Sequence, residues 1–197
     1  SPLCGIGECH NNPFKQDVDE TARMAGLDIK IDAILNMKRE MCALFVGDVT
    51  TAHNEGVKVA CEHYATDMVG DADIVVANCY MKANEIILAP LIAASVLKLG
   101  GGDMVVIFNT PEGQIPMFWT RSWGKNMGGR GWYPRQKLPP NTRRLTIMTP
   151  YPERAGVDCI APAKLVNWRK TWSEVLGELK NTHGRKAKVV VLPDVTV

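Results

Sequence analysis

Polar side chains follow three stretches of this sequence that are predicted to be buried strands, and they are the first candidates for chemistry. Tyr80 and Lys82 lie in segment 78–85, directly after an apolar, β-branched run at 72–79. Polar residues also follow two later predicted strands, in segments 109–114 and 149–154. Ligands of open α/β sheets bind beyond the carboxyl ends of the strands. We therefore expect ligand contacts in these three segments.

Segment 114–141 lacks periodicity and is longer than an ordinary connection, which is typical of a functional loop. Arginines such as Arg121 and Arg130 alternate there with aromatic residues such as Trp132. One interpretation is a loop that closes on an anionic ligand, with arginines binding a carboxylate or phosphate. The alternatives are a contact between subunits of a homo-oligomer, a loop held by buried tryptophans, or a surface for single-stranded nucleic acid.

The remaining candidates are weaker. Cys4, Cys9 and His10 match no standard zinc spacing, so we predict no metal site there. His53 follows a predicted helix cap and is either a ligand contact or a hydrogen-bonded structural histidine. The glycine triplet 100–102 follows a helix rather than a strand, so it is no dinucleotide-binding fingerprint.

Composition narrows the function classes. The 197 residues are 46% apolar and 22% charged, and the formal net charge of +2 does not by itself favour nucleic acid. No apolar run reaches the ~18 residues that a membrane span needs. The six cysteines show no disulfide spacing, and Cys42, Cys61 and Cys79 are predicted to be small buried apolar residues. We therefore expect a cytoplasmic protein without nucleic-acid or membrane partners.

Two groups of elements must position these residues. The first 69 residues are predicted to form a helix at 17–25, strands at 27–35 and 41–46, and a helix at 52–64. Asp17 or Asp19 would cap the first helix, and Thr50 or Thr51 the second. Ile29 and Ile31 would share the buried face of the antiparallel hairpin.

Residues 70–197 are predicted to form a small doubly wound, Rossmann-like α/β domain with a mostly parallel sheet. We predict strands at 72–79, 103–108, 144–149 and 188–192, and helices at 85–99 and 164–181. Pro90 would lie in the first turn of helix 85–99 or kink that helix. The chain starts at Ser1 rather than at an initiator Met. We expect it to be the rear part of a longer protein.

Several motifs, taken in order, resemble the lactate racemase family. The resemblance extends over nearly the whole chain and rests on Asn12-Pro13, Phe45-Val46-Gly47-Asp48, Ala52-His53, segment 72–77, Leu99-Gly100-Gly101-Gly102, Pro111-Glu112-Gly113 and segment 187–194.

The resemblance implies a two-domain enzyme with its active site between the domains. Residues 1–69 would be the tail of the amino-terminal cofactor domain, with Asn12 and His53 on the cofactor side, and 70–197 the carboxyl-terminal domain. The family uses a nickel pincer nucleotide, which accepts a hydride from the carbon bearing the hydroxyl of a 2-hydroxyacid and returns it to either face of the ketone. The cofactor ligands would lie in the missing amino-terminal half, which this chain requires as a partner.

The sequence departs from the family at two positions. Lactate racemases place a Gln and a Lys three residues apart on the helix after the first strand of this domain, and Leu88 and Leu91 stand there instead. Lys82, Arg121 or Arg130 could replace the lost cation, and Trp132, with Trp123 as the alternative, matches a family tryptophan. We therefore expect a racemase or epimerase of a 2-hydroxyacid other than lactate. The alternatives are a non-catalytic α/β binding domain and an oxidoreductase that releases the keto product.

Overall fold

The computed structural model describes residues 4, 7–9, 11–67, 69–114, 137–157 and 160–196. The chain divides into two compact units, Ser1–Asp67 and Met68–Val197, each of which is described by itself. Among the described residues, no helix combines the length and apolar character that a membrane crossing requires. Whether the first unit is the tail of a cofactor domain stays a prediction.

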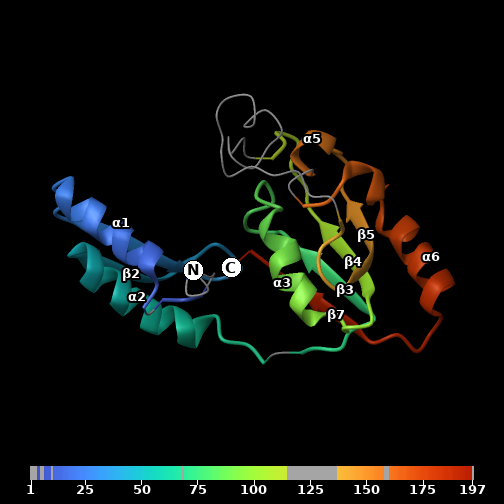
Figure 1. Ribbon diagram of the computed structural model, residues 1–197, viewed down its shortest axis with the longest axis horizontal. Helices are drawn as coiled ribbons and strands as arrows, with labels where there is room; N and C mark the ends of the chain where they lie inside the picture. The colour runs from blue at the N-terminus through green and yellow to red at the C-terminus, as the bar shows by residue number, and fades with distance from the viewer. Residues whose placement is uncertain are drawn as a thin grey trace. The chain divides into compact units, whose positions relative to one another are not determined.

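The first unit has the predicted order of helix, hairpin and helix (Figure 1): α1 (Pro13–Met24), β1 (Lys30–Leu35), β2 (Met41–Gly47) and α2 (Val49–His63). The predicted caps were wrong. Asn12 caps α1, because its Oδ1 accepts hydrogen bonds from the amides of Phe14 (3.0 Å) and Lys15 (3.4 Å), and Pro13 is the first helical residue. Asp48 caps α2 in the same way, through the amides of Thr50 and Thr51.

The predicted burial of Ile29 and Ile31 was also wrong. Strands β1 and β2 pair antiparallel, with Ile31 opposite Val46, and α2 packs on one face of the hairpin. Ile29 and Ile31 lie on the other face and are 62% and 66% exposed. That face also carries Leu44 and Val46, so the first unit has an uncovered apolar surface on its sheet.

The second unit is an α/β domain, which confirms the predicted fold class. Its parallel sheet has the order β6-β5-β4-β3-β7, and Figure 1 shows α3 and α6 on opposite faces. The elements are β3 (Ile74–Asn78), α3 (Leu88–Val96), β4 (Gly102–Ile107), β5 (Thr142–Met148), α5 (Arg154–Val157), the 3-10 turn η1 (Ala163–Leu165), β6 (Val166–Arg169), α6 (Trp172–His183) and β7 (Val189–Leu192). Pro90 lies in the first turn of α3, as predicted.

Alternate residues of each strand build two cores. Val75 and Ala77 face the large core under α3, whereas Ile74 and Val76 face a smaller core formed with Val175 and Leu179 of α6. The single predicted helix at 164–181 was wrong in its first half, because segment 166–169 pairs with β5 as β6. Only the second half is helical, and it begins after Thr171, which forms a capping box with Glu174.

The cysteines divide into one buried and several accessible thiols. Cys79 is buried after β3, as predicted, whereas Cys42 and Cys61 are exposed. Burial, together with the nearby Asp194 carboxylate, raises the pKa of the Cys79 thiol to about 12.

We therefore expect Cys79 to resist a thiol-specific disulfide reagent at pH 8 in the folded protein, while Cys42 and Cys61 react rapidly. Replacing Cys79 with serine should leave the fast phase unchanged and remove one thiol that appears only after denaturation. A fast phase that loses one thiol in the Cys79→Ser variant would contradict the prediction.

Candidate functional site

The carboxyl ends of the five parallel strands meet at one edge of the second unit, where the sequence predicted the ligand contacts. Polar groups are buried beneath this edge: Thr110 and Gln114 follow β4, Thr149 follows β5 and Thr196 follows β7. Buried polar groups need hydrogen-bond partners, so their bonds show how the loops are held.

Gln114 joins three of the loops. Its Oε1 accepts from the amide of Ile86 (3.0 Å), and its Nε2 donates to the carbonyl of Ala83 (3.0 Å). The amide of Gln114 donates to Oε2 of Glu153, 2.5 Å away, in the loop after β5. Gly113 permits this approach, because its φ is +81° and an added Cβ would lie 2.9 Å from the same Glu153 oxygen.

Asp194 fixes the loop that carries Tyr80 and Lys82. One of its carboxylate oxygens accepts from the amide of Met81 (2.9 Å), and the other accepts from the amide and hydroxyl of Thr196 (2.9 and 2.6 Å). The Thr196 hydroxyl in turn accepts from the amide of Lys82 (3.2 Å). The backbone at 81–82 is thereby held while the Lys82 side chain stays exposed.

The predicted substrate-side residues that the structure describes follow one another along this edge. Tyr80 is 47% exposed, and the Lys82 ammonium makes no hydrogen bond or ion pair with another described residue. Two turns connect Lys82 to α3, since Glu85 donates to the Lys82 carbonyl (2.8 Å) and Leu88 to the Glu85 carbonyl (3.2 Å). Leu88 is half-buried and Leu91 is 54% exposed. Arg121, Arg130, Trp123 and Trp132 lie outside the described residues.

The second predicted set lies in the first unit, where polar side chains meet between α1, α2 and β1. Asp19, the one buried described residue of α1, pairs with Lys15 (2.5 Å) and accepts from the Thr50 hydroxyl (3.4 Å). Lys30 of β1 pairs with Asp32 (2.7 Å) and lies 3.4 Å from Nδ1 of His53 on α2. Asn12 is not central to this group: its carbonyl caps α1, and its amide donates to Glu8 (3.0 Å).

These surroundings keep the His53 imidazole neutral. Partial burial, followed by the charges of Lys15 and Lys30, lowers its pKa below the ordinary 6.5, although Asp32 and Asp19 oppose the shift. A neutral imidazole at pH 7 can accept a proton or a hydrogen bond from a ligand.

We expect a histidine titration by NMR to place the pKa of His53 below 6.5, and the Lys30→Ala variant to raise this pKa because one neighbouring positive charge is lost. Lys58→Ala, which removes an exposed lysine of α2 paired with Glu55, is the matched control and should leave the pKa of His53 unchanged. An equal shift in both variants would show that the Lys30 contact is not the cause.

A solved structure resembles this chain over most of the chain's length. The chain is similar to the lactate racemase apoprotein from Thermoanaerobacterium thermosaccharolyticum, with a TM-score of 0.64 and 18% sequence identity. The match covers 94% of this chain and 48% of that protein, so the chain spans about half the length of the solved structure. No family model matches, and no curated protein matches by sequence. At this identity the likeness shows the fold.

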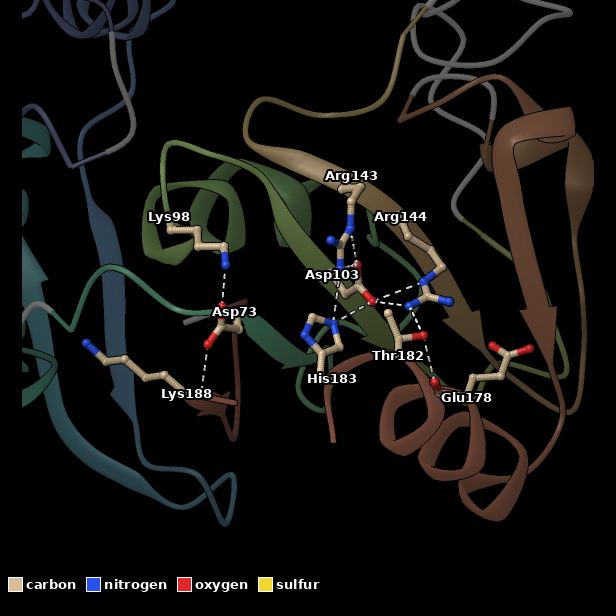
Figure 2. Close-up of polar contacts among 9 residues, drawn as sticks. All are labelled: Asp73, Lys98, Asp103, Arg143, Arg144, Glu178, Thr182, His183 and Lys188. Carbon is tan, nitrogen blue, oxygen red and sulfur yellow. Dashed lines mark hydrogen bonds and ion pairs between the residues drawn. The ribbon is translucent and has the colours of Figure 1, made fainter. Parts of the chain in front are cut away.

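A denser charge cluster lies at the opposite, amino edge of the sheet (Figure 2). Asp103, at the start of β4, accepts hydrogen bonds from Arg143, Arg144 and His183. Nearby, Asp73 pairs with Lys98 and accepts from the amide of Lys188. Because ligands of such sheets bind at the carboxyl edge, we assign this cluster to structure rather than to chemistry.

Several site residues were missed by sequence reasoning. Lys15, Asp19 and Arg23 recur every four positions and Lys30 alternates with Asp32, a pattern that could have revealed a polar face opposite the apolar one. No local signal connects Gln114 or Asp194 to the loops that they hold, since their partners lie 28 to 113 residues away.

Proposed function

We propose that this chain is the carboxyl-terminal part of a nickel-pincer-nucleotide-dependent racemase or epimerase of 2-hydroxyacids, with a substrate other than lactate. The observation that carries the proposal is the match to a lactate racemase apoprotein over 94% of the chain, in agreement with the ordered motifs of the sequence. The likeness supports a racemase-like domain. The inference about the substrate rests on the residues at the carboxyl edge of the sheet.

In this proposal the second unit binds the substrate. Asp194 and Thr196 hold the backbone of residues 81–82 at the carboxyl edge, and the exposed Lys82 ammonium pairs with the substrate carboxylate. Tyr80 lies two residues before it. Arg121, Arg130 and Trp132 contribute further contacts.

The apolar Leu88 and Leu91 favour a different substrate from lactate. They occupy the positions where lactate racemases carry polar groups, and Leu91 is more than half exposed although it is apolar. An exposed leucine on the helix that follows the Lys82 loop suits a substrate with an apolar substituent larger than a methyl group.

The first unit would face the cofactor through Asn12 and His53. A neutral His53 is suited to accept a proton or a hydrogen bond, and partial burial, followed by the charges of Lys15 and Lys30, lowers its pKa. The described residues contain no group of three His, Cys, Asp or Glu side chains that could hold a metal ion. They therefore do not provide a nickel site, and the proposal assigns the nickel ligands to the part of the polypeptide outside this chain.

The same remaining part is the proposed partner of the first unit. The uncovered hairpin face with Ile29, Ile31, Leu44 and Val46 is apolar, and an apolar face of this kind is normally packed against another element. We propose that the amino-terminal half of the protein covers it. Cytoplasmic location and homo-oligomer formation remain part of the proposal.

The proposal is tested on the protein isolated from its native source. We expect a polypeptide about twice as long as this chain, consistent with the 48% coverage of the matching structure, with bound nickel and an additional cofactor mass. Chiral analysis should show racemisation or epimerisation of a 2-hydroxyacid that carries an apolar substituent, with lactate a poor substrate. A nickel-free native protein, or release of the keto product without return of the hydride, would contradict the proposal.

Replacing Lys82 with alanine in that protein should raise KM for the hydroxyacid about tenfold, because a charge-assisted hydrogen bond to the carboxylate is lost. Lys164→Ala is the matched control, since Lys164 is exposed just before the amino end of β6, and it should leave KM unchanged. Equal KM values for Lys82→Ala and the unmodified enzyme would remove Lys82 from the substrate site.

A further inference from the structure

An apolar groove lies on one face of the sheet of the second unit and follows α6 from Trp172, at its amino end, to Arg185, beyond its carboxyl end. Its volume is about 800 Å³. The floor is formed by the side chains of β3 and β7 that face the α6 side, and one wall is formed by α6 itself. The apolar lining residues are Ile74, Val76, Ile107, Trp172, Leu176, Leu179, Ala187, Val189 and Val191.

The groove exists because α6 covers only part of its face. The helix contacts β5 and β6, which lie at the far side of the sheet from β7. On β7, Val190 and Leu192 pack on the large core, whereas Val189 and Val191 point to the α6 side and are 50% and 59% exposed. Strands of a parallel sheet are normally covered on both faces, so β7 has an uncovered β-branched surface.

One end of the groove is basic. Lys180, in the last turn of α6, and Arg185, in the connection to β7, line it. Neither side chain forms an ion pair with another described residue, and the carboxylates of Asp103, Asp73 and Glu178 are paired with other cations. Lys180 also interacts favourably with the partial negative charge at the carboxyl end of α6. That charge is about half an elementary charge, so Lys180 and Arg185 together keep a net positive charge.

The other end of the groove is aromatic. It contains Trp172 at the amino end of α6. The capping box of Thr171 and Glu174 lies at the same end of the helix, but neither residue lines the groove. Of the described lining residues, Lys180 and Arg185 carry the charge, so the groove is polarised, with an aromatic end and a basic end.

We propose that this groove binds an elongated apolar carboxylate, such as a medium-chain fatty acid. Its tail lies between Val191 and Leu176, and its carboxylate pairs with Arg185 and Lys180. The volume lies within the range of small-molecule sites, which are mostly apolar with a few polar groups that set the orientation. The site is distinct from the proposed substrate site, because Lys180 and Arg185 lie just before the start of β7, at the amino edge of the sheet, and Lys82 lies at the carboxyl edge.

The test uses decanoate as the probe and the full 197-residue chain. Decanoate should shift the amide NMR signals of Val189, Val191 and Leu176 in a saturable manner. Decylamine, which has the same tail and the opposite charge, should bind at least about tenfold more weakly, since it meets two cations instead of pairing with them.

Two charge variants locate the carboxylate. Lys180→Glu combined with Arg185→Glu should weaken decanoate binding about tenfold or more. Lys186→Glu changes the charge of a neighbouring exposed residue that does not line the groove, and should have a much smaller effect. Circular dichroism of each variant checks that the fold is kept, and Val191→Gln, a change in the groove floor that adds no charge, should also weaken binding.

Three outcomes would overturn the proposal. The first is the absence of saturable shifts at these residues, and the second is equal binding of decanoate and decylamine. The third is concentration-dependent broadening of the groove signals without decanoate, together with a dimer in sedimentation, which would make a second copy of the chain the occupant.

Discussion

Replacing Asp103 with asparagine is expected to lower the free energy of unfolding of the second unit by about 3–5 kcal/mol. Asp103 is 1% exposed and accepts from Arg143 (3.0 Å), from Nε of Arg144 (3.0 Å) and from His183 (2.9 Å), as Figure 2 shows. Asparagine keeps the shape but removes the charge, and its amide group would direct hydrogens at the same donors. Most of the lost stabilisation comes from the interactions of Asp103 with Arg144 and His183, because Arg143 is 55% exposed and can be solvated by water.

The measurement is chemical denaturation followed by tryptophan fluorescence, which reports on this unit because all five tryptophans lie beyond residue 117. Asp71→Asn is the matched control. Asp71 is exposed, has a φ of +60° that asparagine tolerates, and should change stability by less than about 0.5 kcal/mol. Equal stability of the Asp103 and Asp71 variants would show that the cluster does not stabilise the fold.

The same variant has a defined pH dependence. Burial alone would raise the pKa of Asp103, but the hydrogen bonds from Arg144, His183 and Arg143 outweigh it and hold the pKa below the ordinary 3.8. A carboxyl group with a lowered folded pKa contributes its stability fully above the unfolded pKa, and loses it as the pH falls through the folded value. The difference between wild type and Asp103→Asn should therefore be constant near neutrality and shrink below about pH 4.

The β-branched runs predicted most of the second unit correctly, because strands buried on both faces have a strong sequence pattern. β3 and β4 were found with α3 between them, and α3 proved shorter than predicted. β6 was missed because Leu165, Trp168 and Trp172 have helical spacing, although Trp168 belongs to a strand that packs on the large core. A four-residue edge strand obtains its stability from pairing with β5, which its own sequence does not encode.

The hairpin shows a different limit. Its alternating pattern predicted two strands and two faces, and both exist. The pattern cannot say which face is covered within this chain. Here α2 packs on the face with Phe45, where Gly56 lies close to the aromatic ring, and the isoleucine face is uncovered. The hydrophobic face predicted as buried is buried only if a further element covers it, which is the basis of the proposed amino-terminal partner.

At the candidate site, the sequence predicted the loops but not what holds them. A sheet edge follows from strand order, so Tyr80 and Lys82 could be placed at a ligand-binding edge. The backbone of their loop is held in place by Asp194 and Thr196, which lie near the carboxyl end of the sequence. Long-range side-chain-to-backbone bonds of this kind have no periodic signal, and the residues that make them were absent from the sequence-based candidates.

The second large effect is expected at Gly102, where alanine should destabilise the second unit by about 2–4 kcal/mol. An added Cβ would lie 2.7 Å from Cδ2 of Leu97, 2.8 Å from the carbonyl oxygen of Asp73 and 3.0 Å from that of Ala72. The leucine can change rotamer, but the two carbonyls cannot move freely. The Asp73 carbonyl accepts from Asp103 (2.9 Å), and the Ala72 carbonyl from Lys98 (3.1 Å).

The glycine triplet supplies its own controls, because its members have different environments. The sequence analysis treated the three glycines as one triplet that follows a predicted helix. Gly100 has no atom within 4 Å of an added Cβ, so Gly100→Ala should be neutral within about 0.5 kcal/mol. Gly101 has a φ of +90°, so Gly101→Ala should cost about 1 kcal/mol through backbone strain. The denaturation midpoint should therefore be highest for Gly100→Ala, lower for Gly101→Ala and lowest for Gly102→Ala. Equal losses of stability at all three positions would mean that the triplet acts only as a flexible helix end. The close approach of β4 to the carbonyls of residues 72 and 73 would then not be the cause.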